Sequence, residues 1–110
     1  MARLKSGIWV RATLRRLAAQ GLMAVVARKG DEDAGDVMVK HRQGDGRYHV
    51  LSQARRGEEL VWINRTGTEP VSEAEADRMI ARAVDVDGDL WVIEIEGGTD
   101  GAILLEAVLP

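Results

Sequence analysis

Hydrophobic residues recur at helical spacing near the start of the chain. Residues 6–20 carry apolar side chains at positions i, i+4, i+7 and i+8 of a helix, namely Val10, Leu14, Leu17 and Ala18. Ser6 is expected to cap the start of this helix, and Gly21 to end it in a left-handed conformation. The pattern predicts a helix that packs with one side only.

A second amphipathic helix is predicted after Pro70. Ser72 and Glu75 have the spacing of a capping box, in which the serine oxygen accepts a hydrogen bond from the backbone of the third helical residue. Acidic side chains in the first turn suit the positive end of the helix dipole. The apolar stripe of this helix consists of Ala76, Met79, Ile80, Ala83 and Val84.

Five short segments carry the patterns of β-strands: residues 22–28, 37–42, 48–54, 60–65 and 90–96. The first is apolar on both faces, which predicts a strand in the interior of a sheet. The last alternates Trp91, Ile93 and Ile95 with partly polar positions. It is therefore expected to be half-exposed and to end the sheet.

The second and third strands are predicted to form a hairpin. They are separated by residues 43–46, which contain an Asp-Gly pair, the strongest short hairpin signal in the sequence. A loop of this length places Val37, Val39 and His41 on the same face as Val50, Ser52 and Ala54. The other face is then expected to be mostly wet, and carries Lys40, Arg42, His49 and Gln53.

The element order α-β-β-β-β-α-β indicates an α+β fold in a single domain over residues 1–110. Short connections favour a mainly antiparallel sheet of four to five strands. The simplest arrangement packs both helices on one face and leaves the other face partly polar. The apolar tail, residues 102–109, is expected to pack on the domain or against another subunit.

Composition excludes several kinds of chemistry. The chain has no cysteine, so disulfides, thiolate catalysis and cysteine-based zinc sites are absent. No apolar stretch is long enough for a signal peptide or a membrane span, and a cytoplasmic location is expected. No nucleophile motif or phosphate-binding loop is found, so no catalytic residue and no cofactor is predicted.

Two acid-rich segments could offer oxygen ligands to a hard cation: the loop 31–36 and the turn around Asp85, Asp87 and Asp89. Neither matches the twelve-residue calcium loop. Because acidic turns are common for solvation, no metal site is predicted, although cation binding by the loop 31–36 stays open. A small enzyme using the carboxylates of this loop is a minor possibility.

Charge is unevenly divided along the chain, although the net charge is only −3. Residues 1–30 hold seven Arg and Lys and no acid, whereas residues 57–110 hold three basic and thirteen acidic residues. Oppositely charged segments of one domain can pair internally, and we favour that interpretation. The alternative is a basic surface for nucleic acid or another acidic partner.

The candidate basic surface lies on the open sheet face and the first helix, and consists of Arg11, Arg15, Lys40, Arg42, Arg47 and His49. Single-stranded nucleic acid generally also needs aromatic stacking surfaces. The chain has no phenylalanine, and its one tyrosine is expected to face the core. A solvated basic face is therefore the simpler interpretation, and weak nucleic-acid binding is the alternative.

Three stretches have a familiar sequence: residues 3–10 (RLKSGIWV), 28–35 (RKGDEDAG) and 87–96 (DGDLWVIEIE). In this order and spacing, the chain resembles a family of small uncharacterised bacterial proteins, domain-of-unknown-function family 1491. The resemblance covers nearly the whole chain and implies a compact bacterial cytosolic protein. It implies no activity, cofactor or catalytic residue.

Two hypotheses of function remain. The first is a non-enzymatic interaction module that binds a protein partner or a second copy of itself through an open sheet edge or the apolar tail. The second is a weak nucleic-acid-binding protein that uses the basic surface. The sequence identifies neither a ligand nor a partner.

Overall fold

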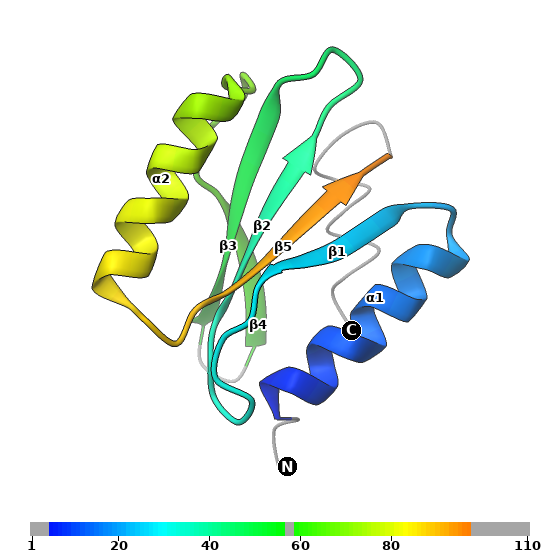
Figure 1. Cartoon of the computed structure of the whole chain (residues 1–110), viewed down its shortest axis with the longest axis vertical. Helices are drawn as coiled ribbons and strands as arrows, with labels where there is room; N and C mark the ends of the chain where they lie inside the picture. Colours follow the sequence, from blue (N-terminus) through cyan, green and yellow to red (C-terminus); the bar gives the residue numbers. More distant parts are fainter. Residues whose placement is uncertain (1–4, 57–58, 98–110) are drawn as a thin grey trace.

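The computed structural model describes residues 5–56 and 59–97. In chain order its elements are α1 (Ser6–Ala19), β1 (Met23–Arg28), β2 (Val37–Arg42), β3 (Tyr48–Arg56), β4 (Glu59–Asn64), α2 (Glu73–Val86) and β5 (Trp91–Glu96) (Figure 1). This order and the α+β class are those predicted from the sequence. The predicted packing of the tail, residues 102–109, lies outside the described residues.

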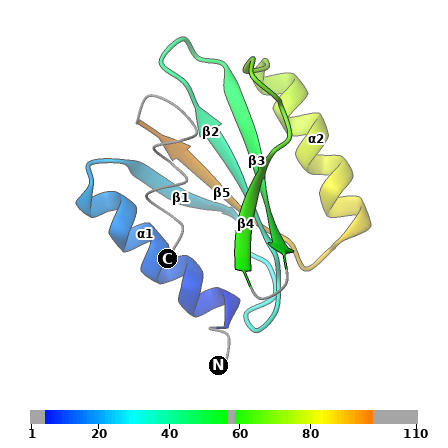
Figure 2. The ribbon, with the colours of Figure 1, turned by 180° about the vertical axis from the view of Figure 1, so that it is seen from behind.

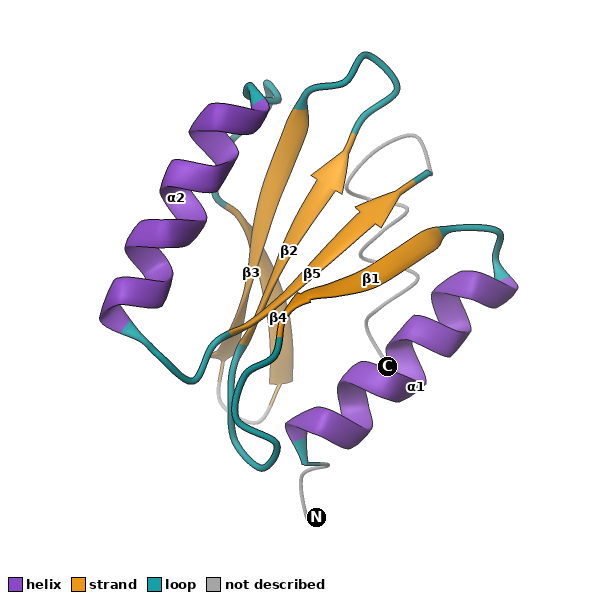
Figure 3. Ribbon diagram, viewed as in Figure 1, coloured by secondary structure: helices purple, strands orange, loops and turns teal. Residues whose placement is uncertain are grey.

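The five strands form one mixed sheet in the order β1-β5-β2-β3-β4 (Figure 3). Strands β2, β3 and β4 follow one another as antiparallel neighbours. Strand β5 pairs antiparallel with β1 and parallel with β2. The mainly antiparallel sheet is thus confirmed, with one parallel pair whose long connection runs through β3, β4 and α2.

The two helices cover opposite faces of the sheet, so the expectation that both lie on one face is wrong (Figures 1 and 2). On the α1 face the buried cluster consists of Val10, Leu17, Leu22, Val37, Val39, Leu51, Trp91, Ile93 and Ile95. On the α2 face it consists of Met38, Tyr48, Val50, Ala76 and Leu90. The physical reason is that β2 and β5 carry apolar side chains on both faces, and each helix offers only one apolar stripe.

The β2–β3 hairpin forms as predicted, but its register differs by one residue. The turn spans residues 43–47, because the Gln43 N–H donates to the Arg47 carbonyl and Asp45 accepts from the Arg47 N–H. His41 therefore lies opposite His49, and Lys40 opposite Val50. The odd loop length moves β3 side chains to the other face than expected.

Strands β1 and β5 have exchanged the places expected for them. The apolar β1 was predicted inside the sheet, yet it forms one edge, and most of its side chains are exposed. Strand β5 was expected to end the sheet, yet it lies between β1 and β2. Its Val92 is buried along with Trp91 and Ile93, because both faces of a central strand are covered.

Candidate functional site

Lys40 was predicted to lie on an open basic surface, but it is buried beneath α2. Its Nζ contacts the carboxylates of Glu73 at 2.8 Å and Asp77 at 2.9 Å, and lies 4.7 Å from the centre of the Tyr48 ring. Burial disfavours the charged form, but the two carboxylates outweigh it and raise the pKa of Lys40. The bond from Lys40 in turn lowers the pKa of Glu73. Lys40 therefore anchors the first turns of α2 to the sheet.

The other predicted basic residues do not gather into one surface. Arg42 pairs with Glu96 at 2.7 Å, and Arg47 with Asp45 of its own turn at 2.8 Å. Arg11 pairs with Glu32, and Arg15 is exposed on α1. The nucleic-acid hypothesis stays a prediction, but the structure separates the residues on which it rested.

The uneven charge along the sequence is partly paired in space. Basic side chains of the first thirty residues contact the acidic loop, through Lys5–Asp33, Arg11–Glu32 and Lys29–Glu32. Basic side chains of β2 contact acids of the last third, through Lys40–Glu73, Lys40–Asp77 and Arg42–Glu96. These ion pairs join each charged end to the middle segment 31–56 and not the two ends to each other, so direct internal pairing of the ends stays a prediction.

His49 is buried on the α1 face beside His41. Its Nδ1 lies 2.6 Å from the Thr66 hydroxyl, which itself donates to Asn64, so Nδ1 carries the proton. Burial and the neighbouring His41 lower the pKa of His49. His41 contacts the Gly97 carbonyl through Nε2 at 2.7 Å and the Gln43 amide through Nδ1. Both rings therefore have structural partners.

The acidic loop serves the start of α1. Ser6 does not cap this helix, because Lys5 is the N-cap residue, and the Lys5 side chain makes no capping hydrogen bond. Instead the Asp33 and Glu32 carbonyls accept hydrogen bonds from the Ser6 and Gly7 N–H groups. The Glu32 side chain pairs with Arg11, and this bond lowers the pKa of Glu32. Loop carbonyls and an acidic side chain thus replace the missing cap.

The same loop packs tightly on the start of β5. A Cβ at Gly30 or Gly35 would collide with the Asp89 carbonyl, and the Trp91 indole donates to the Asp31 carbonyl at 2.8 Å. The described parts of the three stretches on which the family resemblance rests, residues 5–10, 28–35 and 87–96, therefore meet at one junction. Packing and backbone hydrogen bonds hold this junction together.

The carboxylates of the described residues do not gather into a metal site. No group of three or more His, Cys, Asp or Glu side chains in this part of the chain is placed to hold a metal ion. In the acidic loop, Asp31 accepts bonds from the backbone of residues 33 and 34, the carboxylates of Glu32 and Asp33 pair with lysine or arginine, and Asp36 lines the groove beside α2. Neither α1 nor α2 is long and apolar enough to cross a membrane.

The open edge of the sheet at β1 carries an unusual share of exposed apolar side chains. Among the described residues the exposed large hydrophobics are Ile8, Met23, Val25, Val26, Ile63 and Val86, and three of these belong to β1. Met23 is 67% exposed and Val25 is 56% exposed. The apolar run of β1 is visible in the sequence, and it predicted a strand in the interior of the sheet. An apolar edge strand and a buried strand have the same pattern, so the pattern does not distinguish them.

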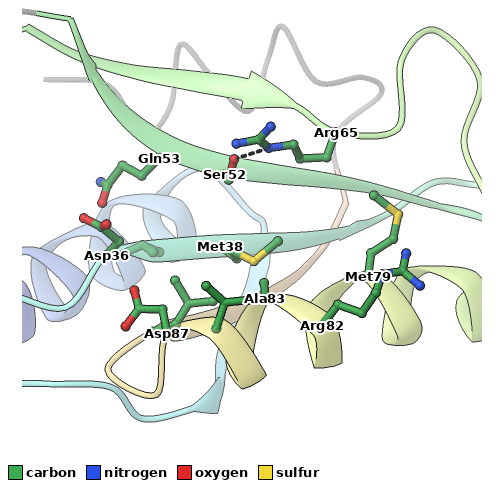
Figure 4. A pocket seen from close by; sticks show the side chains of 12 residues that line it. Asp36, Met38, Ser52, Gln53, Arg65, Met79, Arg82, Ala83 and Asp87 are labelled. Carbon is green, nitrogen blue, oxygen red and sulfur yellow. Dashed lines mark hydrogen bonds between the residues drawn. The ribbon is translucent and has the colours of Figure 1, made fainter.

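A groove on the α2 face is the second candidate surface, and it was not predicted from the sequence. It has a volume of about 520 Å³ and lies between the end of α2, the start of β2 and the middle of β3 (Figure 4). Met38, Ala83 and Leu90 give it an apolar lining, and Arg65 and Arg82 lie along its rim. These residues come from four separate segments, so no local pattern marks the groove. We refer to it as the α2 groove.

These features define a small α+β protein in which a five-stranded mixed sheet lies between two helices. The chain belongs to the protein family of unknown function DUF1491, whose family model matches residues 4–105. The family resemblance seen in the sequence is thereby confirmed. No curated protein matches the chain.

Solved structures of bacterial proteins are similar to this chain over most of its length. A crystal structure of a DUF1491 family protein from Caulobacter crescentus is 39% identical, with a TM-score of 0.75, and the match covers 86% of this chain and 89% of that one. A solution structure from A. tumefaciens is 34% identical, with a TM-score of 0.78 and 91% of each chain covered. An NMR structure of a DUF1491 family protein from C. crescentus is 39% identical, with a TM-score of 0.75, covering 92% and 91%.

Proposed function

We propose that the protein is a non-enzymatic interaction module of the cytoplasm that associates with a second copy through the open edge of β1. The observation that supports this most directly is the exposure of Met23 and Val25 on β1, which has one neighbour, β5, among the described strands. An edge strand presents unpaired N–H and C=O groups, which can accept a further strand. Apolar side chains beside these groups favour such pairing.

The sequence of β1 is compatible with pairing to itself. A two-fold axis through Ala24 sets two β1 strands antiparallel, so that Met23 of one copy lies opposite Val25 of the other. The most exposed apolar side chains of both copies then form one patch on one face. Ala24 lies on the axis with its side chain on the opposite face, toward the α1 cluster, and the irregularity between Val26 and Arg28 lies outside the paired stretch.

Such a contact is expected to be weak. Pairing about Ala24 brings residues 23–25 of the two β1 strands opposite each other, and so short a stretch buries less than the roughly 1,200 Å² of a standard stable interface. The association is therefore concentration-dependent, as is typical of modules that bind reversibly.

The solution mass tests the proposal. Sedimentation should show a monomer–dimer equilibrium for the unchanged chain and a monomer for Val25→Lys, because the lysine places a charge in the centre of the paired patch. Val86→Lys is the matched control, since Val86 is 90% exposed but lies at the end of α2. A wild-type chain that stays monomeric at millimolar concentration would overturn the proposal, as would equal effects of the two lysines.

Cross-linking tests the register. The chain has no cysteine, so Ala24→Cys introduces a single thiol. Residues directly opposite in antiparallel strands have Cα atoms about 4.5–5.5 Å apart, a separation that a disulfide can span. Mild oxidation should therefore link this variant into dimers much faster than Val86→Cys. Equal rates would show that β1 does not pair about Ala24.

A further inference from the structure

The α2 groove is separate from the β1 edge, and its chemistry points to a ligand of its own. The groove has the volume of a small-molecule site, for which about 300–1,000 Å³ is typical. Met38 and Leu90 are buried in its lining, whereas Ala83 is only half-buried and Val86 is exposed. Apolar surface is thus presented to solvent between the helix and the sheet.

Charged side chains divide the rim of the groove into two ends. Arg65 and Arg82 lie toward one end, and Asp36 and Asp87 toward the other (Figure 4). Since opposite charges lie at the two ends, an apolar ligand gains most if it carries a negative group near the arginines and a positive group near the aspartates.

The arginine end is arranged to receive a carboxylate. Arg65 donates through Nε to the Ser52 hydroxyl at 2.7 Å, which holds the guanidinium over β3. Arg82 comes no closer than 4.0 Å to Glu75, whose carboxylate is held more tightly by Arg78 at 2.6 Å. Arg65 thus contributes a guanidinium group from the sheet side of the groove and Arg82 one from the helix side, and guanidinium matches a carboxylate in two-point hydrogen bonding.

The spacing of the two ends indicates the length of the ligand. Along α2, Arg82 and Asp87 are five residues apart, which is about 7.5 Å of helix. Along the sheet, Asp36 lies two residues before Met38, which pairs with Ser52, and two residues of strand span about 7 Å. An extended peptide covers about 3.5 Å per residue. Two to three residues therefore join the ends.

We propose that the α2 groove binds a free apolar di- or tripeptide, with its carboxylate at Arg65 and Arg82 and its amino group at Asp36 and Asp87. The apolar side chains of the peptide then contact Met38, Ala83 and Leu90. This binding is independent of the association through β1, and the two proposals fail separately.

Methyl NMR titration with trileucine tests this proposal. Addition of the free peptide should shift the methyl signals of Met38, Met79 and Ala83, which line the groove. Acetylation of the amino end and amidation of the carboxyl end should each weaken binding about threefold to fivefold, as expected for exposed charge pairs. No shift at these methyls, or equal affinity for free and doubly capped peptide, would overturn the proposal.

Variants assign the two ends. Arg82→Ala should weaken binding of the free peptide but not of its amide, whereas Arg78→Ala is a matched control because Arg78 lies on the same helix outside the groove. Asp36→Asn should weaken binding of the free peptide but not of the acetylated peptide. Ala83→Leu should fill the groove and abolish binding of all forms.

One further variant separates this proposal from self-association. Val25→Lys should bind trileucine as the unchanged chain does, since β1 contributes nothing to the groove. Loss of peptide binding in this variant would contradict the assignment of the ligand to the α2 groove.

Discussion

The two faces of the sheet are held in different ways. On the α1 face, nine buried apolar residues form one cluster, and Val10 and Leu17 of the helix are fully buried. On the α2 face the buried cluster has five residues, and Ala76 is the only buried residue of the helix among those described. Lys40 and the α2 groove occupy the rest. Packing secures the first face, whereas the second combines ion pairs with accessible apolar surface suited to binding.

Truncation of one apolar residue on each helix should give the largest contrast between the faces. Leu17→Ala removes a fully buried side chain and should lower the free energy of unfolding by about 3–4 kcal/mol. Met79→Ala removes a half-buried side chain beside the groove and should cost about 1 kcal/mol. Urea denaturation followed by tryptophan fluorescence measures both. Equal losses would contradict the view that the α2 face is the less tightly packed.

The ion pairs of Lys40 provide the second contrast. Lys40→Met should cost about 1–2 kcal/mol, since it removes charged hydrogen bonds but leaves Glu73 and Asp77 in water. The double variant Glu73→Gln, Asp77→Asn should cost more, because it removes both hydrogen-bonding carboxylates from a buried ammonium group and leaves only the more distant Glu94. Both are measured by urea denaturation at pH 7. A smaller loss in the double variant would show that Lys40 is not held by these acids.

The pH dependence of this anchor follows from the two shifted groups. The pKa of Glu73 is lowered, so its contribution is present above its ordinary pKa of 4.5 and is lost as the pH falls through the folded value. The pKa of Lys40 is raised, so its contribution is present below 10.5 and is lost at higher pH. The difference in stability between wild type and Lys40→Met should therefore be constant between about pH 5 and 10.

The helix caps give a smaller effect. The Ser72 hydroxyl accepts from the Glu75 N–H at 3.2 Å, so Ser72→Ala should cost about 1 kcal/mol. Ser6 was predicted to be the equivalent cap of α1, but the carbonyls of the acidic loop take that role. Ser6→Ala should therefore leave the thermal midpoint unchanged. A decrease in the thermal midpoint as large as that of Ser72→Ala would show that Ser6 does cap α1.

Local patterns in the sequence predicted each element and most of its limits. Ser72 with Glu75 marked the start of α2, and Gly21 ends α1 with a φ of 82°. The arrangement of these elements was harder to predict. Val37, Met38 and Val39 are apolar on both faces of β2, a pattern that indicates a helix on each side of the sheet. The predicted hairpin register instead left one face of β2 and β3 exposed to water.

The candidate surfaces depended on tertiary contacts that no local pattern contains. Inclusion of Arg47 in the hairpin turn shifted the register by one residue and brought His49 to the α1 face. The apolar run of β1 was visible, but its place at the edge depends on β5 pairing beside it. Arg65 and Arg82 meet at the α2 groove from separate elements, so only the folded chain joins them.

The smallest expected effect concerns His49 on the α1 face. Burial lowers the pKa of His49, so the folded state favours the neutral ring. The unfolded chain then binds more protons as the pH falls below the ordinary value of 6.5, and stability decreases through the folded pKa. His49→Gln should remove this part of the pH dependence, because glutamine stays neutral and can donate to Thr66.

The measurement compares the free energy of unfolding at pH 7.5 and pH 5.5 for the wild type and His49→Gln. The wild type should lose more stability than the variant over this interval. An equal loss in the wild type and His49→Gln would show that His49 is as easily protonated in the folded as in the unfolded chain. Burial of His49 beside Thr66 would then not keep the imidazole ring neutral in the folded chain.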